Sequence, residues 1–197
     1  MFGYTGYKKN AFTLAEVLIT LGIIGVVAAM TIPTLMMNYQ KQVWESKLKK
    51  VYSVATNACE RMLIEENVSA VNETEVYGEI TNDNIKKYFK LMKDGESVAG
   101  KGFSILLPDG AILYLTAANN GFNFYTDVNG LDGKPNLAGR DEFEFSLDKD
   151  CSFNTTLGED ASEAAKAFKF VVENDWKIPG EYPASTTTTT TTTTTTE

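Results

Sequence analysis

The stretch that decides the fold is residues 11–37, which read AFTLAEVLITLGIIGVVAAMTIPTLMM. Its only charged side chain is the carboxylate of Glu16. As an α-helix rising 1.5 Å per residue, the stretch would extend roughly 40 Å, which is enough to cross a hydrocarbon core about 30 Å thick. We therefore expect residues 12–37 to form a transmembrane helix.

Charge is distributed unevenly on either side of this stretch. The whole chain of 197 residues has a net charge of -8, from 18 Lys and Arg against 26 Asp and Glu. Lys8 and Lys9 lie just before the apolar stretch, and the acidic excess lies after it. The charge bias predicts a cytoplasmic N-terminus and an extracytoplasmic C-terminal part. An acidic chain also argues against nucleic acid as the main partner, because binding phosphates requires a basic surface.

The residue composition narrows the possible chemistry. The chain contains no His, so catalytic triads, general bases and metal sites that depend on His are excluded. Carboxylate pairs and sites for hard cations remain possible. A signal-anchored periplasmic enzyme therefore stays open as one interpretation, although no pair of carboxylates stands out as a catalytic constellation.

Three interpretations of the apolar stretch compete. A cleaved secretory signal would use the small residues Val27, Ala28 and Ala29 before a new start at Met30. A plain membrane anchor is the second interpretation. In the third, the helix has a further role besides anchoring. Glu16 favours this interpretation, because inserting a carboxylate at the centre of a bilayer costs about 2.5 to 3.5 kcal/mol of free energy and implies a partner for the charge.

A family resemblance begins at Lys8. The run KKNAFTLAE at residues 8–16, followed by the apolar residues 17–32, resembles the N-terminal processing and methylation segment of type IV pilins and of type II secretion pseudopilins. The resemblance implies that a prepilin peptidase cuts between Ala11 and Phe12 and methylates the new amine of Phe12. The apolar helix would remain in the mature protein.

Within this segment, three residues have expected roles. Phe12 and Glu16 are four residues apart and share a helix face, so the Phe12 amine of one copy can neutralise Glu16 of a displaced neighbour. Glu16 would then set the register of assembly. Pro33 lacks a backbone donor and is expected to kink or loosen the helix, as the proline at this place in the family does.

The rest of the chain predicts a pilin-like α+β fold, with a long N-terminal helix packed on a small antiparallel sheet. An apolar stripe with solvated flanks, Glu45 among them, extends the helix to about Glu66. Shorter helices are expected at residues 81–93 and 159–174, and strands at 103–107, 111–115, 122–128 and 142–147. The expected parts are a leader at 1–11, the membrane helix at 12–37, a domain at 38–183 and a disordered Thr-rich tail at 184–197.

The loop at residues 127–141 has two interpretations. Its oxygen-bearing side chains could bind Ca²⁺, and the resemblance to pseudopilins implies a calcium site in this late region. The alternative is an irregular turn held by side chain to backbone hydrogen bonds, and the loop does not fit the EF-hand pattern. The candidate ligands are Asp127, Asn129, Asp132 and Asp141.

The chain has two cysteines, Cys59 and Cys151. In an oxidising compartment they could form one disulfide, which would close a loop of about ninety residues and stabilise the fold by on the order of 4 kcal/mol. The alternative is two buried thiols that pack as small apolar side chains.

The leading expectation is a non-enzymatic subunit of a type II secretion pseudopilus that supports protein export. Its expected partners are further copies, other pilin-like subunits, the prepilin peptidase and the secretion platform in the bacterial cytoplasmic membrane. A type IV pilin used in adhesion, motility or DNA uptake is the alternative, because the N-terminal segment is common to both.

Overall fold

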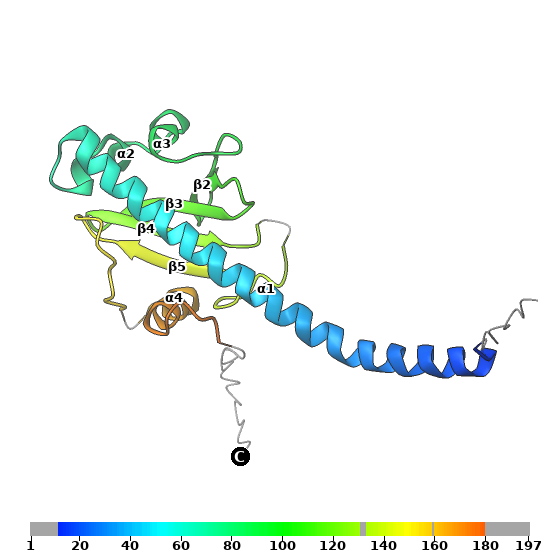
Figure 1. Cartoon of the computed structure of the whole chain (residues 1–197). Coiled ribbons are helices and arrows are strands. Elements are labelled where there is room, and N and C mark those ends of the chain that lie inside the picture. Colours follow the sequence, from blue (N-terminus) through cyan, green and yellow to red (C-terminus); the bar gives the residue numbers. More distant parts are fainter. Residues whose placement is uncertain (1–11, 131–132, 159, 180–197) are drawn as a thin grey trace, which may run out of the picture. The chain divides into compact units, whose positions relative to one another are not determined.

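The computed structural model describes residues 12–130, 133–158 and 160–179 (Figure 1). The chain divides into two compact units, one ending at Gln40 and the other beginning at Lys41. Each unit is described by itself below.

One helix, α1 (Leu14–Glu66), runs through the unit boundary. It continues through Pro33, whose missing N–H leaves the carbonyl of Ala29 without its usual helical donor. The helix ends at Glu66, so the predicted extension beyond the apolar stretch is confirmed.

The remaining elements are short. They are η1 (Val71–Glu73), α2 (Glu75–Gly78), α3 (Asn82–Tyr88), β1 (Ser97–Val98), β2 (Gly102–Leu106), β3 (Ile112–Ala118), β4 (Gly121–Asp127), β5 (Glu142–Leu147) and α4 (Glu163–Glu173).

The five strands form one antiparallel sheet in the order β1-β2-β3-β4-β5. Four of them fall where the sequence predicts strands, and the α+β fold class is confirmed. The fifth, β1, is only two residues long. A strand of that length has no alternation of apolar and polar residues, so the sequence pattern could not reveal it.

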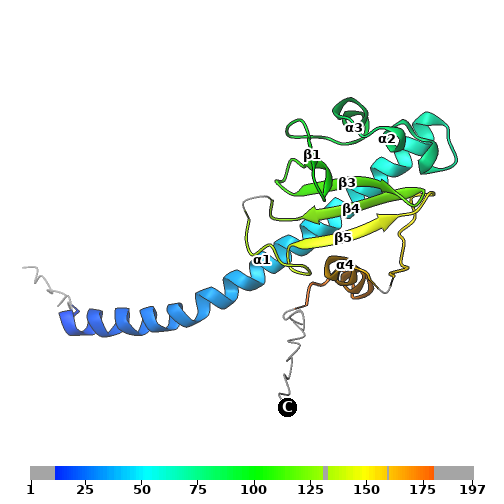
Figure 2. The same cartoon turned by 180° about the vertical axis from the view of Figure 1, so that it is seen from behind.

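The core of the second unit lies between α1 and the sheet (Figures 1 and 2). Along β5, buried Phe143, Phe145 and Leu147 alternate with partly exposed Glu142, Glu144 and Ser146. This period of two directs one set of side chains to the core and the other to the opposite face. The helix contributes a buried stripe to the same core: Leu48, Val51, Ala55, Ala58, Cys59 and Met62.

Helix α4 packs against the sheet at β5 (Figure 2). The ring of Phe168 stacks on Phe145 at a centroid distance of 4.8 Å and lies 5.8 Å from the ring of Tyr52 on α1. These aromatic contacts join α1, β5 and α4 into one core.

Two predicted helices are shorter in the structure than the sequence pattern suggested. Helix α3 is capped by Thr81 and ends at Tyr88, with Phe89 in extended conformation after it. Helix α4 begins at Glu163, after Ser162, whose hydroxyl accepts a hydrogen bond from the N–H of Ala165. At α3 the apolar spacing continues to Met92, beyond the end of the helix, whereas at α4 the cap residue Ser162 sets the start.

Glu45 is the clearest correction to the predicted helix surface. The sequence placed it among the solvated flanks of α1, whereas the residue is buried, with 7% of its surface exposed. Its carboxylate accepts the backbone N–H of Ile178 at 3.0 Å and a hydrogen bond from the ammonium of Lys177 at 3.3 Å. Glu45 therefore holds the segment after α4 against α1. Helical periodicity reflects only contacts between residues close in sequence, so it could not predict this one.

Candidate functional site

The first turn of α1 is closed by a reciprocal pair of side chains. The hydroxyl of Thr13 accepts the backbone N–H of Glu16 at 3.2 Å, and the carboxylate of Glu16 accepts the backbone N–H of Thr13 at 3.2 Å. The Thr13 hydroxyl also donates to the same carboxylate oxygen at 3.2 Å. This is a capping box, which satisfies backbone donors that a helix N-terminus otherwise leaves unpaired.

Thr13 is not among the residues that the sequence predicts for this site, although its hydroxyl forms half of the capping box. The signal was present, because Thr-x-x-Glu directly before an apolar run is the pattern of a capping box. The capping box fixes the position of the Glu16 carboxylate at the start of the helix. It also gives the Glu16 carboxylate two hydrogen-bond donors from Thr13 of the same chain.

Phe12 lies immediately before this turn and is exposed, with 84% of its surface accessible. Ala11, the other residue of the predicted cleavage site, lies outside the described residues. Together, the exposed Phe12 and the capped Glu16 form the part of the predicted assembly site that the structure describes.

The apolar side chains of α1 before Lys41 are exposed, among them Leu18, Ile23 and Met30, at 60%, 61% and 74%. The described residues contain one helix long and apolar enough to cross a membrane, and it is this one. So much exposed apolar surface requires a covering of lipid or protein. Gly22 and Gly25 lie in the same stretch, and a Cβ added at either would meet no atom within 4 Å. The surface at these positions is thus open to close approach by another helix.

The loop after β4 is organised by two carboxylates. Asp127 accepts the backbone N–H groups of Asn129 and Gly130, each at 3.1 Å. Asp141, which is fully buried, accepts the backbone N–H groups of Asn136 and Leu137 at 2.8 and 2.7 Å. The side-chain amide of Asn129 also donates to Asp141 at 2.8 Å.

This network brings together three of the four predicted calcium ligands, Asp127, Asn129 and Asp141, while Asp132 lies outside the described residues. Asp141 accepts three N–H donors from this loop, which is how a carboxylate holds a turn. Within the described part of the chain, no group of three or more Asp, Glu, Cys or His could hold a metal ion.

Burial raises the pKa of Asp127 to about 6, and the nearby charges of Asp141 and Glu142 act in the same direction. The two backbone hydrogen bonds to the Asp127 carboxylate oppose this shift but do not cancel it. Asp127 therefore titrates in a pH range where an ordinary aspartate is fully ionised.

Cys59 of α1 and Cys151, which follows β5, are joined by a disulfide with a Cα–Cα distance of 5.8 Å. Both residues are buried, with exposed fractions of 1% and 3%. The bond connects the long helix to the far end of the sheet's last strand across 92 residues of sequence.

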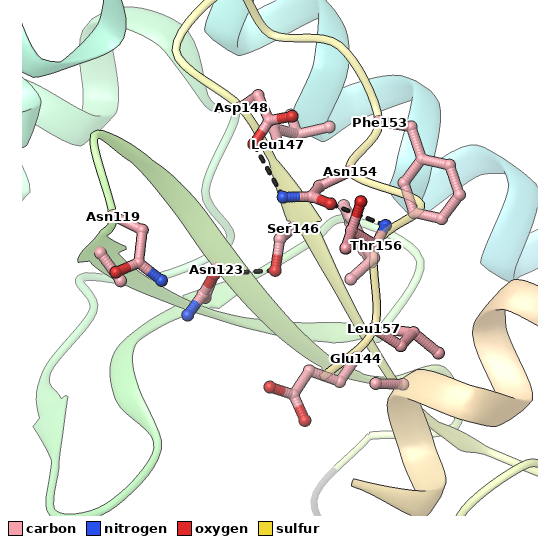
Figure 3. Close-up of a pocket in the computed structure, with 13 residues that line it drawn as sticks. Asn119, Asn123, Glu144, Ser146, Leu147, Asp148, Phe153, Asn154, Thr156 and Leu157 are labelled. Atoms are coloured by element: carbon pink, nitrogen blue, oxygen red, sulfur yellow. Dashed lines mark hydrogen bonds between the residues drawn. The ribbon is translucent and has the colours of Figure 1, made fainter. Parts of the chain in front are cut away.

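A small cavity of about 170 Å³ opens beside β5, between this edge strand, residues 153–157 and Ala165 of α4 (Figure 3). Polar side chains of β4, β5 and residues 153–157 dominate its lining. The hydroxyl of Ser146 donates to Asn123 at 2.8 Å, and the amide of Asn154 donates to Asp148 at 2.8 Å. The cavity is smaller than the 300 to 1,000 Å³ typical of a site for a drug-sized ligand, so it has room for one side chain.

These observations first define a class, an α+β protein of pilin-like architecture. A long N-terminal helix, apolar in its first part, is followed along the chain by a small antiparallel sheet. Residues 7–32 match the family model described as the prokaryotic N-terminal methylation motif. This motif is the prepilin cleavage signal of type IV pilins and pseudopilins, which are structural proteins. No curated protein and no solved structure matches the chain.

Proposed function

We propose that this chain is a structural subunit of a type II secretion pseudopilus. It is inserted in the cytoplasmic membrane with its N-terminus inside, cut by the prepilin peptidase between Ala11 and Phe12, and assembled through its N-terminal helix. The observation that carries the proposal is the methylation motif at residues 7–32, continued by an exposed apolar helix of membrane-spanning length.

The Phe12 amine and Glu16 direct this assembly. The capping box holds the Glu16 carboxylate at the start of α1, next to the exposed Phe12. A carboxylate keeps its full charge when it accepts backbone N–H groups, so it still attracts the terminal amine of another copy in a medium of low dielectric constant. Neutralisation of that charge on assembly favours the displaced arrangement in which amine and carboxylate meet.

The processing step is tested by the intact mass and N-terminal sequence of the protein purified from membranes. We expect a chain that starts at N-methylated Phe12, and the full-length chain in a strain with an inactive prepilin peptidase. A start at Met30 would indicate a secretory signal and would remove the proposal. A start at Met1 in the peptidase-positive strain would do the same.

The choice between a pseudopilin and a type IV pilin needs a second experiment. Deletion of the gene should abolish export of proteins through the secretion system and leave surface filaments, motility and DNA uptake unchanged. The opposite pattern would favour the type IV pilin alternative, with the same processing at Phe12.

A further inference from the structure

Three asparagines among the described residues lie in the pattern Asn-x-Ser/Thr, which is the acceptor sequence for N-linked glycosylation. These asparagines are Asn67, Asn72 and Asn154, and the hydroxyl residues two positions later are Ser69, Thr74 and Thr156. So short a pattern also occurs by chance. The amide is the group that is modified, and the pattern requires the hydroxyl, so both must be accessible to an enzyme. The structure can therefore distinguish the three sites.

Two of the three patterns are engaged in contacts within the chain. In the second pattern, Thr74 is buried, and its hydroxyl donates to the carbonyl of Val71 at 2.7 Å while it caps α2. In the third, the side-chain amide of Asn154 donates to Asp148 at 2.8 Å, and its oxygen accepts the N–H of Thr156 at 2.8 Å. Neither pattern offers both an unengaged amide and an unengaged hydroxyl.

The first pattern offers both groups. Asn67 and Ser69 are exposed, in the connection between α1 and η1 (Figure 1). Within the part of the chain that the structure describes, no hydrogen bond is formed by the side-chain amide of Asn67 or by the hydroxyl of Ser69. Ser69 contributes only its backbone N–H, which donates to Glu73 at 3.2 Å. An exposed connection is where acceptor asparagines are found.

The backbone of Asn67 also ends the long helix. Its φ of +54° is left-handed, and it directly follows the last residue of α1. The N–H of Asn67 donates to the carbonyl of Ile64 at 3.3 Å, and the N–H of Val68 donates to that of Leu63 at 3.1 Å. This is the Schellman motif, which favours Gly or Asn at the left-handed position. The helix end accounts for Asn or Gly at position 67, but it makes no use of the hydroxyl of Ser69.

We propose that Asn67 is an N-glycosylation site. In the transfer reaction, the side-chain nitrogen of Asn67 attacks the anomeric carbon of an oligosaccharide linked to a polyprenyl diphosphate. A bond between nitrogen and that carbon forms, and the bond between the carbon and the diphosphate oxygen breaks. The amide loses one proton to solvent, and polyprenyl diphosphate is the leaving group. No atom is oxidised or reduced.

This inference rests on the proposed orientation of the chain, because lipid-linked oligosaccharides are transferred to proteins outside the cytoplasm. Within the second unit, residues 41–66 of α1 extend roughly 40 Å as a helix. Asn67 therefore lies at the end of this unit opposite Lys41. Neither Asn67 nor Ser69 belongs to the core, so a bulky, hydrated glycan at this end displaces no packed side chain.

The site can be tested on the full chain purified from membranes of the bacterium that produces it. Trypsin should release residues 62–86 as one peptide, which contains both Asn67 and Asn72. We expect the mass of this peptide to be raised by sugar residues, and fragmentation by electron transfer to place them on Asn67. An unmodified peptide from a chain that starts at Phe12 would overturn the inference and leave the proposed function standing. A chain that starts at Met1 would remove the proposed function and, with it, the orientation that the inference needs.

Two positions supply matched variants. Ser69→Ala should lower the glycosylated fraction of the peptide at least tenfold, whereas Ser69→Thr keeps a hydroxyl and should retain the glycan. Asn67→Gly removes the amide but suits the left-handed helix end, so the glycan should be lost while the near-ultraviolet circular dichroism stays the same. Equal glycosylation of Ser69→Ala and Ser69→Thr would contradict recognition of the acceptor pattern.

The control is Asn72→Gln, because Asn72 is an exposed asparagine on the same peptide. This variant should carry the glycan to the same extent as the native chain. Loss of the glycan in Asn72→Gln would place it on the other acceptor pattern. Sugar that persists in Asn67→Gly would be attached to another group of the peptide, and either result would overturn the inference.

Discussion

Glu16 combines two properties that different substitutions can separate. Its carboxylate accepts the Thr13 N–H in the capping box, and it carries the charge of the apolar stretch. Glu16→Gln retains an oxygen acceptor for the N–H and removes the charge, whereas Glu16→Ala removes both.

We predict that both variants insert in the membrane but fail to assemble, because in the proposed assembly the Glu16 charge pairs with the Phe12 amine of another copy. Only Glu16→Ala should also loosen the first turn of α1, since loss of a capping interaction costs about 1 kcal/mol. Filament yield measures the first effect, and hydrogen exchange of the amides near Thr13 in micelles measures the second. Normal filaments from Glu16→Gln would contradict the role of the charge.

Asp127 makes the stability of the second unit depend on pH. The pKa of Asp127 is about 6 in the folded protein, against an ordinary value of 3.8. The folded state therefore binds the proton more tightly than the unfolded state. The resulting stabilisation is complete below pH 3.8 and is lost as the pH rises through 6.

Asp127→Asn should remove this dependence, because Asn keeps an oxygen for the N–H groups of Asn129 and Gly130 but carries no charge. We expect the free energy of unfolding of the variant to exceed that of the native chain by on the order of 1 to 3 kcal/mol at pH 8, and to equal it near pH 4. Urea unfolding at both pH values measures this. Asp83→Asn, at an exposed aspartate, is the control and should show no such difference.

At the scale of elements, the disulfide attaches the start of the β5–α4 connection to α1. Replacing both Cys59 and Cys151 by Ala should lower the free energy of unfolding by about 4 kcal/mol, because the unfolded chain regains the freedom of a loop of 92 residues. Urea unfolding of the detergent-solubilised protein tests this. Reduction of the native chain should reproduce the loss, and an unchanged unfolding midpoint in both cases would contradict it.

The elements that the sequence predicted well have long, regular patterns. Helix α1 and strands β2 to β5 each bury one face in the core, and the spacing of apolar residues reports that face directly. Boundaries were predicted less well at the end of α3, where Phe89 takes an extended conformation, and at the start of α4, where Ser162 caps the helix. Capping is a hydrogen-bond effect and is not visible in apolar spacing.

The site residues also differ in how far the sequence could predict them, depending on whether their contacts are local or distant along the chain. Phe12 and Glu16 lie in a local motif of nine residues, so the sequence alone could identify them. The burial of Glu45 depends on Ile178, more than 130 residues away, and no local pattern contains that contact. The cavity beside β5 was also missed, because its lining comes from the β3–β4 hairpin, β5, residues 153–157 and α4, which only the fold brings together.

At the scale of the whole molecule, the packed core belongs entirely to the second unit. Every side chain of the core, including those only partly buried, lies at Trp44 or later. The large apolar side chains of residues 12–40 are exposed and take no part in it.

We therefore predict that a fragment starting at Lys41 folds without the membrane helix. Its thermal unfolding midpoint should lie within a few degrees of that of the detergent-solubilised full chain, and its near-ultraviolet circular dichroism should be the same. A fragment with helical signal but no cooperative transition would contradict the prediction. A longer fragment that starts at Phe12 should contain more helix and should need detergent to stay in solution. Its thermal unfolding midpoint should be no higher than that of the shorter fragment.

The disulfide between Cys59 and Cys151 also has a mechanical consequence. In the proposed assembly the subunits are joined through α1, so tension that reaches Cys59 would pass through the covalent bond to Cys151. The chain between them, with the whole sheet in it, lies outside the path of the force. Fully extended, 92 residues would measure about 300 Å. That length cannot be drawn out while the bond is intact, so a stretched assembly can lengthen only in its helices and in the chain after Cys151.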